Sequence, residues 1–307
     1  MQFEENYRWG GWKSCLHIAN DTVDIVATTD IGPRIMRCGF VGDKNLLLEL
    51  KDEMGKTGGE DFKLYGGSRI WHSPEVNPRS YMPDNDPVVY KWDGKTLDLM
   101  QPLEIATGMQ KEIIITLAPL GNKVEVVYRI YNKTLWPIKY ALWALTLMAQ
   151  NGRAIIPQEP FQRWDDNLLP VRPLVLWSYT EMNDPRWTWG KKYIQVKQDP
   201  KSAGPTKVGL LNKLGWEAYS LSGQVLIKRF NFEPNAEYPD YMCNSQVYTD
   251  SKLFELETLS PLKVVEPGSY SEHKENWYLF KADFDESEES IDKNLLPLIE
   301  KTEVPLL

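Results

Sequence analysis

The sequence predicts a mainly β protein, an antiparallel β-sandwich, on three observations. Apolar and polar residues alternate with a period of two in several segments, most clearly over 124–131, as expected for strands with one buried face. Clusters of Gly, Pro, Asn and Asp separate these segments. No long segment repeats with the helical period. Because no composition shift marks a linker, we expect a single domain over residues 1–307.

The expected elements follow one another along the chain. Alternating or continuous apolar runs predict strands at 15–18, 23–26, 34–41, 46–48, 113–115, 124–131, 138–145, 193–196, 216–219, 225–230, 253–259 and 277–280. Between them, 51–62, 76–88 and 157–192 are rich in Gly, Pro or Trp and are expected to be loops. Apolar residues at helical spacing predict a short C-terminal helix over 291–299, although Pro297 interrupts it.

Composition excludes several classes of partner. The 35 Lys and Arg residues against 43 Asp and Glu give a formal charge of -8, and without a basic run we expect no nucleic-acid partner. Three scattered cysteines predict neither a disulfide framework nor a zinc site. The N-terminus does not resemble a signal peptide, and the longest apolar run, 140–149, is shorter than the about 20 residues that cross a bilayer. We therefore expect a cytoplasmic protein without a membrane segment.

One stretch, residues 64–75, carries most of the groups that a polar ligand site needs. Its glycine pair permits a tight turn or close approach to a ligand, Arg69 supplies a fixed fork of donors, and His72 is the one side chain of the stretch whose unperturbed pKa lies near neutrality. Trp71 and Glu75 lie in the same stretch. The alternative is a turn with a stacked Arg–Trp pair and a buried histidine, and the stretch alone does not decide between the two.

The strand at 253–259 is the second informative segment. Because side chains alternate across a strand, Phe254 and Leu256 point one way, whereas Glu255 and Glu257 point the other and lie about 7 Å apart. They form either a pair of functional carboxylates or a solvated strand face. Twelve tryptophans supply candidates for the flat platforms on which sugar rings pack, although most are expected in the core.

The order of these features resembles the galactose mutarotase-like superfamily, which contains the aldose 1-epimerases and folds as an antiparallel β-supersandwich. The resemblance is closest to a poorly characterised bacterial branch of that superfamily. The segments that carry it are 32–35, 45–47, 64–75, the strand after Pro137, 238–240, 256–258, 260–262 and 267–268.

The resemblance implies a mechanism and a set of residues. In aldose 1-epimerases a glutamate takes the proton from the C1 hydroxyl of the sugar and a histidine protonates the ring oxygen, and Glu257 matches that glutamate. Tyr65 and Trp143 stand where the two family histidines belong, so His72 is the expected displaced acid. The expected substrate-binding residues are Arg34, Arg69, Trp71, Glu75, Trp143 and Asp240.

The expected function is therefore that of an aldose 1-epimerase-like isomerase acting on a small-molecule carbohydrate. Two alternatives remain open: a non-catalytic sugar-binding protein, or a glycoside-processing enzyme using Glu75 and Glu257 as a carboxylate pair. No cofactor is expected, and no metal, because two of the three histidines lie in apparent strands or turns without a second ligand at i+2 or i+4 and the cysteines are unclustered. Calcium binding by the acidic loop 84–86 remains an open alternative. The oligomeric state is not predicted.

Overall fold

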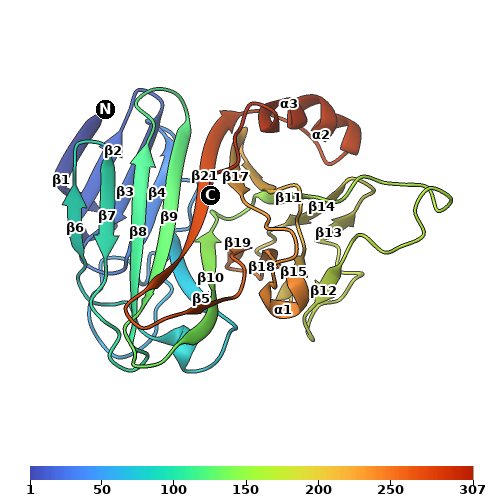
Figure 1. The fold of residues 1–307 in the computed structure, drawn as a ribbon. Coiled ribbons are helices and arrows are strands. Elements are labelled where there is room, and N and C mark those ends of the chain that lie inside the picture. The colour runs from blue at the N-terminus through green and yellow to red at the C-terminus, as the bar shows by residue number, and fades with distance from the viewer. Residues whose placement is uncertain (307) are drawn as a thin grey trace.

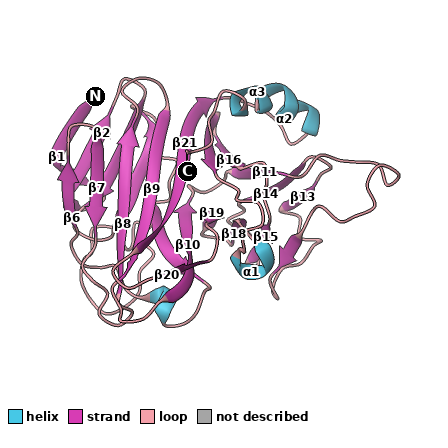
Figure 2. Ribbon diagram, viewed as in Figure 1, coloured by secondary structure: helices cyan, strands magenta, loops and turns pink. Residues whose placement is uncertain are grey.

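The computed structural model describes residues 1–306, and its regular secondary structure consists mainly of strands arranged in two antiparallel sheets (Figures 1 and 2). The predicted mainly β class is confirmed. In spatial order the first sheet contains β1 (Gln2–Trp9), β2 (Trp12–Ala19), β3 (Val23–Thr28), β4 (Arg34–Phe40), β5 (Ser68–Ser73), β10 (Ile138–Leu147), β19 (Phe254–Leu259), β18 (Ser245–Thr249), β15 (Thr206–Leu210) and β12 (Leu174–Leu176), and β20 (Lys263–Val265) pairs with β10. The second contains β13 (Trp187–Trp189), β14 (Tyr193–Lys197), β11 (Arg153–Pro157), β16 (Trp216–Leu221), β17 (Gln224–Phe230), β21 (Tyr270–Lys281), β9 (Lys123–Asn132), β8 (Met109–Leu117), β7 (Thr96–Met100) and β6 (Val89–Trp92).

The main core lies between the two sheets. In β9, Val124, Val126, Tyr128 and Ile130 are fully buried in it, as the period-two pattern predicts. In β19, Phe254 and Leu256 also enter this core, so the carboxylates of that strand face away from it. Each fully buried aliphatic side chain contributes about 1.5–3 kcal/mol, and strand register is therefore strongly specified by the buried face.

A charged group lies inside this apolar core. The Nζ of Lys228 lies 2.8 Å from Glu275 and 3.6 Å from Glu217, and it donates to Thr146 at 3.1 Å. The side chains of Lys228, Glu275 and Glu217 are all fully buried. Burial raises the pKa of Glu217 to about 8 against the opposing influence of Lys228. Burial would also raise the pKa of Glu275, but Lys228 and then His273 bring it below its usual value. Glu275 is thus the carboxylate that balances the charge of Lys228.

The helical elements are short and peripheral: the 3₁₀ turn η1 (Arg79–Tyr81), α1 (Pro239–Met242), α2 (Glu288–Asn294) and α3 (Leu296–Ile299). The predicted C-terminal helix is present, in two pieces, because Pro297 begins a new turn. Ser287 caps α2 by accepting a hydrogen bond from the Ser290 amide. Ile291, Leu295 and Ile299 pack with side chains of the second sheet, and Figure 1 shows both pieces beside the end of that sheet.

Several parts of the chain differ from the sequence-based expectation. Strands β5, β6, β7, β11, β15, β18 and β20 were not predicted, and the strand expected at 46–48 is only an isolated bridge between Leu47 and Met148. β1 was not predicted, because it is an edge strand exposed along most of its length and carries little period-two signal. The expected loop 157–192 contains the short strands β12 and β13. No helix within residues 1–306 is both long and apolar enough to cross a membrane. The prediction of one domain over 1–307 stays a prediction.

Candidate functional site

The first sheet brings the candidate residues together through its strand register. Leu145 on β10 lies opposite Arg69 on β5 and opposite Glu257 on β19, and Glu257 in turn lies opposite Gln246 on β18. Directly opposed residues of antiparallel strands share a face and lie about 5 Å apart. The pairing of Trp143 with Trp71 and Leu259 forms the adjacent row. Residues remote in sequence therefore meet on the face opposite the main core.

A cavity of about 430 Å³ lies over this face, within the roughly 300–1,000 Å³ typical of small-molecule sites. Seven of its fifteen lining residues are aromatic, and such rings provide flat apolar platforms with polar edges. The lining comprises Phe62, Leu64, Arg69, Trp71, Glu75, Tyr81, Trp143, Leu145, Trp177, Tyr179, Pro205, Lys207, Tyr248, Leu253 and Glu255. Four of the predicted binding residues, Arg69, Trp71, Glu75 and Trp143, are among them.

Glu257 lies beneath the cavity and forms a buried ion pair with Lys207. Both of its carboxylate oxygens accept hydrogen bonds from Lys207, at 3.1 and 2.9 Å, and the indole N–H of Trp143 donates to Oε2 at 2.7 Å. The Lys207 ammonium also lies 4.7 Å from the Trp143 ring centroid and 4.9 Å from that of Trp177. Glu257 is fully buried. These contacts hold a carboxylate away from water and occupy both of its oxygens.

Glu255, two residues earlier on β19, is the carboxyl group of that strand that reaches the cavity. Burial, and then the neighbouring Glu257, raise the pKa of the Glu255 carboxyl to about 8. Lys207 and Arg69 oppose that shift without cancelling it. At neutral pH Glu255 is therefore a neutral carboxylic acid, which both donates and accepts hydrogen bonds. Sequence analysis placed it beside Glu257 but did not select it as a site residue.

His72 does not lie with these residues, which corrects the expectation of a displaced acid. It alternates with Arg69 and Trp71 on β5 and therefore points to the other face of the sheet. Its ring centroid lies 6.3 Å from that of Tyr140, a residue of the main core. Burial lowers the pKa of His72 to about 3. The imidazole is neutral and separated from the cavity by the sheet itself.

Arg34 also has a structural position rather than one in the cavity. Its guanidinium forms an ion pair with Asp84 at 2.7 Å and donates to the carbonyl oxygens of Leu64 and Gly66. Arg34 thereby fixes the loop that precedes β5. Tyr65, at the position of a family histidine, is buried and donates its hydroxyl to Asn85.

The glycine pair of this loop serves chain packing. Gly66 and Gly67 have φ values of 104° and 73°, which favour glycine. A Cβ on Gly66 would collide with the carbonyl of Leu48, and one on Gly67 with that of Ile35. The close approach anticipated from the sequence is therefore made to neighbouring backbone.

Asp240 is connected to the site only through one intervening residue, Gln246. It lies on α1 with a left-handed φ of 50° and accepts a hydrogen bond from Gln246 at 2.7 Å, and Gln246 is the strand neighbour of Glu257. Asp240 does not line the cavity. Its predicted binding role therefore has no direct contact to support it.

Several cavity residues were not selected from the sequence. Lys207 comes from β15, and Trp177 and Tyr179 from the segment after β12. The density of tryptophan and arginine over 157–192 is the sequence signal for Trp177 and Tyr179. Nothing in the sequence around Lys207 distinguishes it from any other lysine in a strand. Glu75 lies at the exposed side of the cavity and accepts a hydrogen bond from Tyr81.

Within residues 1–306, no cluster of three or more His, Cys, Asp or Glu side chains is arranged to hold a metal ion. In the acidic loop 84–86, Asp84 is paired with Arg34, and the Asn85 side chain bonds Tyr65, Gly59 and Asp61. We expect a chelator such as EDTA to leave ligand binding unchanged, because the side chains of Asp84 and Asn85 already have protein partners. Calorimetry with and without the chelator tests this, and binding lost on chelation and restored by calcium would contradict it.

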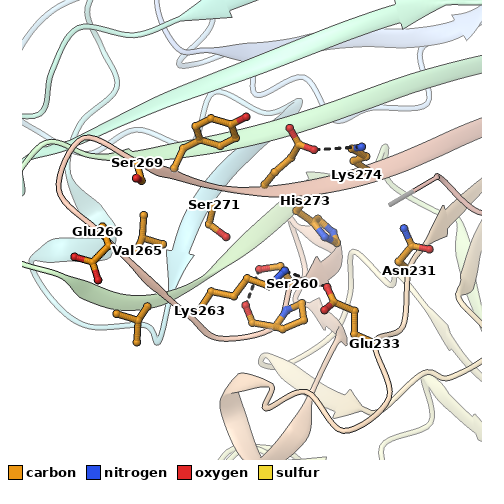
Figure 3. Close-up of a pocket in the computed structure, with 14 residues that line it drawn as sticks. Asn231, Glu233, Ser260, Lys263, Val265, Glu266, Ser269, Ser271, His273 and Lys274 are labelled. Carbon is orange, nitrogen blue, oxygen red and sulfur yellow. Dashed lines mark hydrogen bonds and ion pairs between the residues drawn. The ribbon is translucent and has the colours of Figure 1, made fainter.

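A second cavity of about 550 Å³ lies beside β20 and β21 (Figure 3). Four of its charged side chains form two ion pairs, Lys263 with Glu233 at 3.2 Å and Lys274 with Glu272 at 3.3 Å. His273 points toward it (Figure 3), but its Nε2 is hydrogen-bonded to Thr258. None of the predicted site residues lines this cavity.

Comparison with known proteins identifies the fold. No family model matches the sequence, and no curated protein matches it. A galactose mutarotase-like protein from Lactobacillus casei superposes with a TM-score of 0.57 at 9% identity, covering 87% of this chain and 100% of its own. One from Clostridium acetobutylicum gives 0.52 at 10% identity, covering 91% and 98%. The Slr1438 protein from Synechocystis gives 0.57 at 11% identity, covering 91% and 100%. This chain has the antiparallel β-supersandwich fold of the galactose mutarotase-like proteins.

Proposed function

We propose that this protein is a sugar isomerase of the aldose 1-epimerase type, with the cavity over β5, β10 and β19 as its active site. The observation that carries the proposal is a cavity-facing carboxyl group, Glu255, beside aromatic platforms that include Trp71 and Trp143. The mutarotase-like fold supports it at the level of general class. Anomer exchange requires one group that binds a face of the sugar and another that exchanges protons with it.

A neutral carboxylic acid can perform both proton transfers of this reaction. The hydroxyl of Glu255 donates its proton to the ring oxygen of the sugar, while its carbonyl oxygen accepts the proton of the C1 hydroxyl. The bond between C1 and the ring oxygen breaks, and an aldehyde forms at C1. After rotation about C1–C2, the reverse transfers close the ring as the other anomer. Protons and electrons balance, and Glu255 ends as a carboxylic acid.

This assignment moves the catalytic role from Glu257 to its neighbour. Glu257 has both oxygens bonded to Lys207 and does not line the cavity, so it supports the reaction by keeping Glu255 protonated. The negative charge of Glu257 and the burial of Glu255 both favour the neutral acid. The mechanism needs no histidine, which fits Tyr65 and Trp143 at the positions where family members carry histidines.

The pH dependence of anomer exchange tests the proposal. Glu255 is active as the neutral acid and has a pKa raised to about 8, so catalysis should be constant below that pH. Above it the rate should fall about tenfold per pH unit, as the acid ionises. NMR saturation transfer between anomers, corrected for the protein-free rate at each pH, measures this. A rate that rises through pH 8 would assign a carboxylate base instead and contradict the mechanism.

A second candidate function, carbohydrate binding without catalysis, is favoured by one specific observation. The glutamate that matches the family's base, Glu257, is held by Lys207 and Trp143, as in a structural ion pair. Saturable sugar binding with no anomer exchange above the protein-free rate at any pH would select this function.

A further inference from the structure

Arg69 is unlike the other buried cations of residues 1–306. It is 1% exposed, and its Nε, Nη1 and Nη2 all lack hydrogen-bond partners. Every other buried arginine or lysine has a carboxylate or a backbone oxygen as partner: Arg34, Arg37, Lys111, Arg153, Arg186, Lys207 and Lys228. A buried charge without a partner is strongly disfavoured, so its presence calls for an explanation.

The packing of Arg69 leaves its donors unused. Its guanidinium carbon lies 4.1 Å from the Trp71 ring centroid and 4.9 Å from that of Phe62. Such cation–π contacts engage the faces of the guanidinium, whereas its five N–H groups lie in the plane and form a fork. Burial lowers the pKa of Arg69 to about 9, so the group remains charged at neutral pH. The aromatic contacts therefore stabilise the cation without satisfying its N–H groups.

The cavity offers no protein counter-ion for this charge. Arg69 lines the cavity, but Leu145 separates it from Glu257 in the strand register, and Glu257 is already paired with Lys207. No carboxylate lies within ion-pair distance of Arg69 among residues 1–306. The usual partner of an arginine fork is a planar or tetrahedral oxyanion that accepts two parallel hydrogen bonds.

We propose that Arg69 binds an anionic group, a carboxylate or a phosphate, carried by the sugar that occupies this cavity. The inference rests on the proposed function in one respect, that the cavity takes a sugar. It adds that the substrate is an acidic sugar: a uronic acid or a sugar phosphate. The ligand supplies the missing acceptor, and the aromatic residues beside Arg69 provide packing for the sugar ring.

The test compares charged and neutral sugars on two proteins. Calorimetry measures the Kd of D-glucose, D-glucuronate and D-glucose 6-phosphate, and of the corresponding galactose series, for the natural protein and for Arg69→Met. Methionine keeps an unbranched apolar stem against Trp71 and Phe62 but has no charge. We expect at least one anionic sugar to bind the natural protein about 10–100-fold more tightly than its neutral parent, as charge-assisted hydrogen bonds do. Arg69→Met should abolish this preference and leave the Kd of the neutral sugar within about threefold.

The pattern of preference identifies the group: uronates alone indicate a carboxylate site, and 6-phosphates alone a phosphate site. The inference is overturned if the natural protein shows no preference for either class, or if the preference survives in Arg69→Met. Arg8→Met is the matched control for loss of a positive charge, because Arg8 is exposed on β1, four strands from β5. It should leave the preference intact.

Thermal unfolding supplies a second measurement. Removal of an unpaired buried charge should raise the Tm of the ligand-free protein, whereas an arginine retained only for its aromatic packing predicts a lower Tm with an unchanged sugar preference. Anomer exchange on the same samples separates the two proposals. A preference for acidic sugars without exchange refutes the isomerase alone, exchange without preference refutes the role of Arg69 alone, and absence of any sugar binding refutes both.

Discussion

Replacement of Glu255 by glutamine is expected to lower the rate of anomer exchange by about 100–10,000-fold, the usual contribution of a general acid or base. The amide keeps the shape of the side chain and its ability to hydrogen-bond a hydroxyl, but it has no acidic proton to transfer. Affinity for the sugar should therefore change little, since a lost neutral hydrogen bond costs about 0.5–1.5 kcal/mol. Saturation-transfer NMR gives the rate and calorimetry the Kd on the same sugar.

The matched control is Glu237→Gln, which makes the same chemical change at an exposed residue that pairs with Lys139 outside the cavity. It should leave both the rate and the Kd unchanged. A Glu255→Gln protein with weakened binding and an unchanged exchange rate would remove Glu255 from the catalytic assignment. Loss of both would instead indicate a disturbed cavity, and the Tm of the variant distinguishes that outcome.

The candidate site was predictable only where its geometry is local. Alternation along one strand is a property of the backbone, and for this reason Glu255 and Glu257 could be assigned to one face from the sequence alone. The same rule separates His72 from Arg69 and Trp71 once residues 68–73 are recognised as a strand. The sequence-based interpretation treated this stretch as a turn around a ligand, so it grouped side chains that the sheet divides.

The contacts that set the chemistry are not local. Lys207 reaches Glu257 because β18 lies between β15 and β19 in the sheet, and neither strand order nor register can be obtained from one sequence. The pKa of Glu255 depends on its burial and on charged groups that include Lys207 of β15 and Arg69 of β5, which are far apart in the sequence. The fold class was more accessible, since alternation and turn chemistry repeat over the whole chain and need no knowledge of which strands pair.

Lys228→Met is expected to lower the free energy of unfolding by about 3–5 kcal/mol, because it leaves a buried carboxylate uncompensated. Glu275, whose pKa Lys228 helps to lower against the effect of burial, is the group that loses its partner. Glu217 contributes little to this cost, since its pKa of about 8 keeps it protonated at neutral pH. Urea unfolding at pH 7 measures the change as a shift in midpoint.

The double variant Lys228→Met/Glu275→Gln should recover much of this loss. Glutamine keeps an oxygen that accepts the indole N–H of Trp277, which donates to Glu275 at 2.7 Å, and no charge then remains unpaired at this point of the core. Lys139→Met removes a cation from an exposed pair with Glu237 and should change stability by less than about 1 kcal/mol. If Lys228→Met is as mild as Lys139→Met, the buried pair does not carry the stability assigned to it. If the double variant is less stable than Lys228→Met alone, the cost lies in lost hydrogen bonds rather than in the unpaired charge.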